Sequence, residues 1–178
     1  MVKEAMKGVD FYISGVVNTP NSAYAVFING DCSSYFPVEC GKSHSILVES
    51  VLSETADFNI ENFGLYFSFL SMLKAHDIFP TNFSFIVGKK SGLSCSLDVV
   101  EDNELGTKVS RIPMLIADAV VVSVLGRIPV VIYGVAGKDF AFKIDKGIPR
   151  NNVLAFACEE IARAEKMAAL GLEESQEG

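Results

Sequence analysis

The chain has 178 residues, of which 49% are hydrophobic and 21% are charged, and its formal net charge is −7. A chain of this length buries enough apolar surface to fold without disulfides, so we expect one domain over residues 1–172 and a frayed acidic tail at 173–178. The negative charge argues against a protein that coats duplex nucleic acid, because cationic contacts to phosphate provide most non-specific affinity. It is compatible with a local cleft that handles nucleic acid with a divalent cation.

The cysteines and the N-terminus bear on the compartment. The spacings of the four cysteines match no zinc site, and we expect all four to be reduced core residues: Cys32, Cys40, Cys95 and Cys158. Residues 1–10 contain four charged side chains and no apolar core, which is unlike a secretory signal. The longest apolar region, 112–137, is interrupted by charges and by Pro129, so it predicts a buried helix and strand rather than a membrane span. We therefore expect a cytoplasmic protein without membrane contact.

The N-terminal segment predicts three antiparallel strands. Apolar residues alternate with others over 11–17, which is the period of a strand. A β-rich run over Ala23–Ile28 ends at Asn29-Gly30-Asp31, a strong hairpin signal. The chain then returns through Tyr35–Cys40, so the three segments are expected to form a meander.

Two helices are expected next. Ser43 is the expected N-cap of a helix over His44–Leu52. A loop is expected over Ser53–Asn59, and a second helix over Ile60–His76 that stops before Pro80. The residues expected on the buried sides are Ile46, Leu47 and Val51 in the first helix and Leu65, Phe69, Met72 and Leu73 in the second.

The C-terminal half alternates strands and helices. Strands are expected from Phe83 and Phe85, over 93–100, 106–112 and 130–133, and over 140–144 near the last of these; turns are expected over 89–92 and at the acidic stretch 101–104. Helices are expected over 114–125 and 152–170, the second capped by Asn151 or Asn152 and ended by Gly171. This order predicts an α+β fold with a mixed, mainly antiparallel sheet and about four helices packed on it.

The stretch from Asp118 to Tyr133 carries a family resemblance. Asp118-Ala119 opens an aliphatic helix, and eleven residues after the acid Pro129 leads a short strand. This resembles the signature of the bifunctional nuclease domain family, in which Ser-Asp-Ala-Ile-Ala-Leu-Ala continues to a Pro-Ile-Tyr strand. The strand Phe36–Gly41, the helix 64–75 and the hairpin 83–100 agree in order with the family. The resemblance covers Val9 to Tyr133 and implies a nuclease that uses Mg²⁺ or Mn²⁺.

The chain departs from the family pattern at several polar positions. Ala117 stands where the family has Ser, and His44-Ser45 where it has Glu-Ala. Leu65-Tyr66-Phe67 replaces Thr-His-Asp at the head of the second helix, and Arg111 and Pro113 are displaced from the family's Arg-Pro. These departures favour an alternative function, a non-catalytic homo-oligomer that keeps the fold for binding or regulation. The acidic charge and the mean hydropathy of +0.32 favour it as well.

Three side chains are the candidates for hydrolytic chemistry. Asp118 is the expected metal ligand and catalytic carboxylate, since carboxylates hold the Mg²⁺ or Mn²⁺ that activates water at a phosphodiester; the alternative is a helix-capping Asp. His44 is the expected general base or ligand, with a surface or capping histidine as the alternative. Arg111 is the expected phosphate-binding group. The phenylalanines are expected in the core rather than at a base-stacking surface: Phe63, Phe67, Phe69, Phe83 and Phe85.

Overall fold

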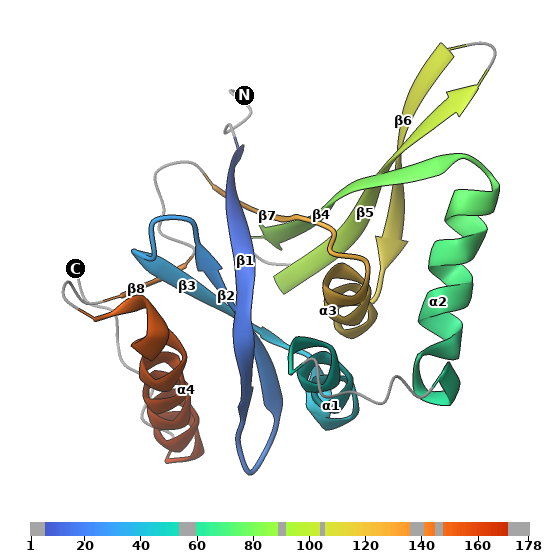
Figure 1. The fold of residues 1–178 in the computed structure, drawn as a ribbon. Helices are drawn as coiled ribbons and strands as arrows, with labels where there is room; N and C mark the ends of the chain where they lie inside the picture. Colours follow the sequence, from blue (N-terminus) through green and yellow to red (C-terminus); the bar gives the residue numbers. More distant parts are fainter. Residues whose placement is uncertain are drawn as a thin grey trace.

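The computed structural model describes residues 6–53, 60–88, 92–103, 106–135, 141–144 and 148–170. Within these ranges the chain forms an eight-stranded sheet and four α-helices (Figure 1). The strands are β1 (Met6–Asn18), β2 (Ala23–Asn29), β3 (Ser34–Glu39), β4 (Ile78–Gly88), β5 (Gly92–Asn103), β6 (Gly106–Met114), β7 (Val130–Val135) and β8 (Phe142–Lys143). The helices are α1 (Gly41–Leu52), α2 (Ile60–Ala75), α3 (Ile116–Leu125) and α4 (Val153–Ala169), with a 3-10 turn, η1 (Arg150–Asn152), before α4.

The strand order is β6-β5-β4-β7-β1-β2-β3-β8. Every neighbouring pair is antiparallel except β4 and β7, which are parallel. The predicted α+β class with a mixed, mainly antiparallel sheet is therefore confirmed. Strand β7 joins two local meanders, because it pairs with β4 on one side and with β1 on the other.

Helices cover both faces of the β1–β3 half of the sheet. Figure 1 shows α4 on one side of β1 and β2, and α1 and α3 on the other. Strand β2 alternates accordingly: Ala25 and Phe27 belong to the core under α1 and α3, whereas Val26 and Ile28 pack with Val153 of α4. The residues of β2 are therefore almost all apolar, as expected for a strand that is covered on both faces.

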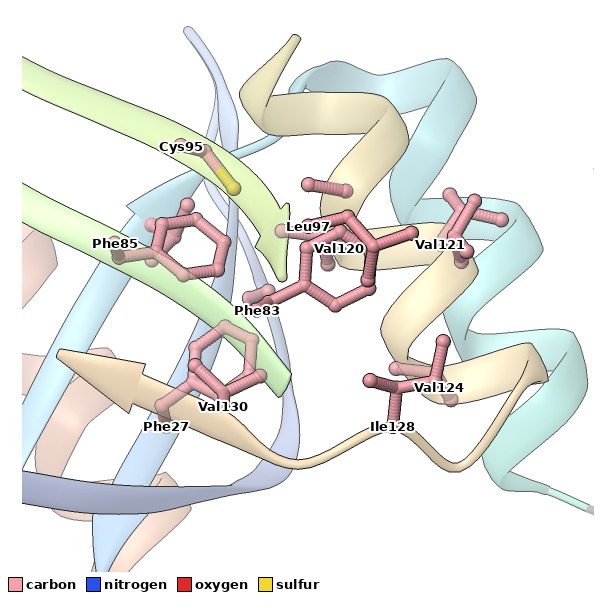
Figure 2. Close-up of a cluster of buried hydrophobic side chains, with 14 of the residues drawn as sticks. Phe27, Phe83, Phe85, Cys95, Leu97, Val120, Val121, Val124, Ile128 and Val130 are labelled. Carbon is pink, nitrogen blue, oxygen red and sulfur yellow. The ribbon is translucent and has the colours of Figure 1, made fainter. Parts of the chain in front are cut away.

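The larger core lies between the sheet and α3. Figure 2 shows Phe83 of β4, Leu97 of β5 and Val120 of α3 meeting there, and all three are fully buried. The next residues along β4 and β5 point to the opposite face, because side chains alternate along a strand. Ser84 and Asp98 are the buried polar residues of that opposite face.

Two predicted helix caps are wrong. Helix α1 begins at Gly41, whose φ of +73° suits glycine, so Ser43 falls inside the first turn and does not cap it. Asn152 precedes α4 but makes no side-chain cap hydrogen bond. Its backbone is already helical because η1 leads into α4, whereas a capping side chain needs an extended backbone.

Two expected strand features also differ. The acidic stretch 101–104 does not form the expected turn at residues 101–103, because β5 continues to Asn103. Glu101 lies directly opposite Lys108 of β6, so the two strands are joined there by a pair of opposite charges. Strand β8 pairs with β3 rather than near β7, and the ring of Phe142 stacks on Tyr35 with centroids 5.3 Å apart. The expected turn at 89–91, the loop at 54–59, Gly171 and the tail at 173–178 lie outside the described residues.

Several predicted core residues are exposed. Cys158 is exposed and Cys32 is half-buried, so only Cys40 and Cys95 match the expectation of buried thiols; all four are free. Leu65 and Met72 of α2 are 77% and 50% exposed. Polar and apolar residues are spread around helix α2, which packs mainly on β4, so its sequence period does not specify the buried side. On α1, Ile46 is likewise 61% exposed, because Ser45 and Val48 face the interior.

The aromatic prediction is mostly confirmed. Phe63, Phe83 and Phe85 are buried and Phe69 packs against the same core, whereas Phe67 is 37% exposed. No helix within the described ranges is long and apolar enough to cross a bilayer.

Candidate functional site

Side chains from three helices meet at Asp118. The Nε2 atom of His44 on α1 lies 3.2 Å from Oδ1 of Asp118 on α3. The hydroxyl of Tyr66 on α2 donates to the same oxygen at 2.9 Å. The side chains of His44 and Asp118 are 31% and 32% exposed, so the cluster is open to solvent while its members are held in place.

The helices that carry these residues explain their position. Asp118 lies in the first turn of α3, and the residues after it, 119–124, are buried in the core. Helix α1 packs against α3 and brings His44 to the start of α3. Oδ1 of Asp118 is used by the two side chains, and among the described residues no side-chain cap forms at the N-cap of α3, Leu115. A carboxylate in this first turn is still favoured by the helix dipole.

The electrostatics of the cluster fix its hydrogen bonds. Burial, the hydrogen bond to Asp118 and the charge of Asp118 raise the pKa of Tyr66 to about 12. Tyr66 is therefore a protonated donor at neutral pH. When the proton of neutral His44 is on Nε2, the Nδ1 atom carries the free lone pair. Among the described residues Nδ1 of His44 has no hydrogen-bond partner, so this atom is available to accept a proton.

Arg111 is not part of this cluster. Its Nε donates to Oδ1 of Asp98 at 2.9 Å, and the two residues are directly opposite each other on β6 and β5. Asp98 also accepts from Ser84 at 2.6 Å and from Asn82 at 3.0 Å through Oδ2. These side chains lie on the face of the sheet opposite the core under α3. The structure thus brings Asp118 and His44 together and places Arg111 in a separate environment.

The donor set at Asp118 does not fit a metal cage. Oδ1 already accepts two hydrogen bonds, and no three His, Cys, Asp or Glu side chains in the described ranges gather closely enough to hold an ion. The displaced position of Arg111 and this donor set mean that the three-residue, metal-bearing arrangement expected from the sequence is not formed by the described side chains.

Tyr66 is the member of the cluster that sequence reasoning missed. In the sequence, Leu65-Tyr66-Phe67 stands where the family has a polar motif. Its hydroxyl nevertheless reaches Asp118 from the second helix. The available signal is the single tyrosine of a helix rich in apolar residues, because a half-buried Tyr usually directs its hydroxyl to a polar partner.

Neither a comparison with protein-family models nor a comparison with curated proteins finds a match to this chain. The resemblance to the bifunctional nuclease domain family therefore stays a prediction.

Proposed function

We propose that this protein hydrolyses phosphodiester bonds in nucleic acid, with His44 as the general base. The observation that supports this most is the 3.2 Å contact between His44 and Asp118 on a solvent-accessible surface. A carboxylate bonded to one ring nitrogen of a histidine orients the imidazole and stabilises its protonated form. General bases of this kind contribute about 10²–10⁴-fold to a rate.

Each member of the cluster has a distinct role in this proposal. The Nδ1 atom of His44 accepts a proton from the attacking water as the new oxygen–phosphorus bond forms and the phosphorus–oxygen bond to the leaving nucleotide breaks. The leaving oxygen takes up a proton from solvent, to which the imidazolium later returns its own. Asp118 holds the ring and balances the charge of the imidazolium. Tyr66 fixes the carboxylate of Asp118 by its 2.9 Å hydrogen bond and is a positioning residue.

None of the proposed steps uses a metal ion. The family resemblance predicts Mg²⁺ or Mn²⁺, with Asp118 as the ligand, but the described side chains do not supply the donor set for it. No step is therefore assigned to a cation. Since Mg²⁺ commonly binds through one or two carboxylates and substrate phosphates, the assay includes both ions.

The test is a cleavage assay on purified full-length protein. Single-stranded RNA and single- and double-stranded DNA are incubated with Mg²⁺, Mn²⁺ or EDTA. We expect His44→Ala to lower cleavage by about 100-fold, and Asp118→Asn to lower it as well. The matched control is His76→Ala, because His76 is the other histidine of the chain and is exposed on the surface. Equal activity of the His44→Ala and His76→Ala proteins would refute the assignment.

A second candidate function is a non-catalytic homo-oligomer. Large apolar side chains are exposed near the head of α1, along α2 and just before α3, and they are those of Ile46 (61%), Leu65 (77%), Met72 (50%) and Leu115 (75%). An oligomer contact that gathered these side chains would remove their apolar surface from water. Light scattering after gel filtration tests this function: an oligomer that Leu65→Glu converts to a monomer, with no cleavage under any condition, would support it. A wild-type monomer would exclude it.

A further inference from the structure

A cavity of about 680 Å³ opens between β1, the end of α1 and the end of α3. Its volume lies within the range of about 300–1,000 Å³ that is typical of small-ligand sites. The inner lining includes Phe11, Phe27 and Val130, which are all at most 4% exposed. Figure 2 shows part of this wall, where Val124 and Ile128 lie at the end of α3. The cavity is separate from the side chains proposed for hydrolysis, since His44, Tyr66 and Asp118 do not line it.

Among the described residues that line the cavity, Arg127 is the charged one, although the whole chain carries a net charge of −7. Arg127 is exposed, as are Tyr12, Leu52 and Pro129, so these four residues form the rim around a mainly apolar interior. The Arg127 side chain makes no ion pair or hydrogen bond with the described residues. A guanidinium stays charged at any physiological pH and has donors for carboxylate or phosphate oxygens.

The backbone of Arg127 adds an independent observation. Its φ of +51° is in the left-handed region, where side chains with a Cβ atom are disfavoured. The residue ends α3 in a Schellman arrangement, in which Ile128 N–H donates to the Ser123 carbonyl at 2.9 Å. Glycine usually occupies this position, yet the chain places its glycine, Gly126, one residue earlier at a φ of −84°. Arg127 thus occupies the glycine position of the motif, and this position places it among the residues that line the cavity.

We propose that this cavity binds a small amphiphile with an apolar body and one anionic group. The apolar body lies against Phe11, Phe27 and Val130, and the anion is bound by Arg127 at the rim. A carboxylate and a phosphate monoester share the required chemistry. The neutral alcohol with the same chain lacks it and serves as the discriminating probe.

The test uses fluorescence of anilinonaphthalene sulfonate bound to the full-length protein, with dodecanoate, dodecyl phosphate and dodecanol as competitors. We expect at least one of the two anions to displace the dye at concentrations about tenfold or more below dodecanol, as for a charge-assisted contact. Displacement of the dye by dodecanoate alone, by dodecyl phosphate alone or by both shows which anion the site accepts. Displacement by dodecanol at equal concentration, or by none of the three, would overturn the proposal.

Substitution of Arg127 separates binding from folding. Arg127→Gly should weaken binding of the anion about tenfold or more and raise the unfolding temperature by about 2–4 °C, because the left-handed strain is removed. Arg127→Lys should keep most of the affinity. The matched control is Asp77→Gly, which removes the same kind of strain at a φ of +55° away from the cavity. It should raise stability and leave affinity unchanged. Unchanged anion affinity in Arg127→Gly would contradict the proposed site.

Discussion

Replacing Asp98 by alanine should destabilise the protein by about 3 kcal/mol. The residue is 8% exposed and accepts hydrogen bonds from Ser84, Asn82 and Arg111. The Ser84 bond is the largest contribution, since Ser84 is fully buried and a hydrogen bond to a buried charged group is worth about 1.5–3 kcal/mol. The Asn82 bond adds about 1 kcal/mol. The Arg111 contribution is at most about 1 kcal/mol, because its side chain is 61% exposed and the solvent screens the pair.

The assay is urea denaturation of wild-type, Asp98→Ala and Arg111→Ala proteins, followed by circular dichroism. Arg111→Ala should lower the free energy of unfolding by less than about 1 kcal/mol. The same two proteins, compared at equal folded fraction, should cleave nucleic acid at the wild-type rate, because Asp98 and Arg111 lie on the other face of the sheet. An Asp98→Ala protein within about 1 kcal/mol of wild type would refute the reasoning about the buried network, and so would an equal cost for Arg111→Ala.

Two further predictions concern titratable groups. The pKa of folded Tyr66 is about 12 against an ordinary value of 10.0, so between these pH values the folded state keeps a proton that the unfolded state loses. The contribution of Tyr66 to the free energy of unfolding is therefore fully present below pH 10 and is lost as the pH rises towards 12. In denaturation measured across this range, Tyr66→Phe should lose less stability with rising pH than the wild type. The same pH dependence in both proteins would argue against the Tyr66–Asp118 contact. Iodoacetamide should modify exposed Cys158 in the native protein but reach Cys95 only on unfolding, because burial raises the pKa of the Cys95 thiol to about 12 and blocks access. Peptide mass spectrometry of briefly labelled protein checks this order, and early labelling of Cys95 would contradict it.

Local signals in the sequence predict most of the elements. Alternation and the turn at Asn29-Gly30 specify the β1–β3 meander, and Pro80 agrees with a helix that ends at Ala75. Errors occur where a tertiary partner decides the outcome. The charge of Glu101 indicates a turn in isolation, but Lys108 opposite it extends the strand. Polar and apolar residues are spread around helix α2, so its packing on the sheet, and not its sequence pattern, leaves Leu65 exposed.

The candidate site was partly predictable for the same reason. Asp118 and His44 each stand out as polar residues beside apolar segments, yet 74 positions separate them, and only the packing of α1 on α3 brings them together. Arg111 is a candidate in the sequence because its guanidinium can bind a phosphate and because it lies close to the position of the family's Arg-Pro. The register of β5 and β6 instead pairs it with Asp98 on the opposite face. The role of Tyr66 is not predictable, because a hydrogen bond from a hydroxyl on one helix to a carboxylate on another leaves no spacing pattern in the sequence.

The most direct test of the account is chemical rescue of His44→Ala by imidazole in the nucleic-acid cleavage assay. Removal of the ring leaves Asp118 and Tyr66 in place and opens the space that a small imidazole can occupy. If His44 is the general base, cleavage falls by about 100-fold in the variant and returns in part as imidazole is added, whereas His76→Ala is unaffected throughout. Wild-type cleavage by His44→Ala, or a loss that imidazole does not restore, would contradict the central claim.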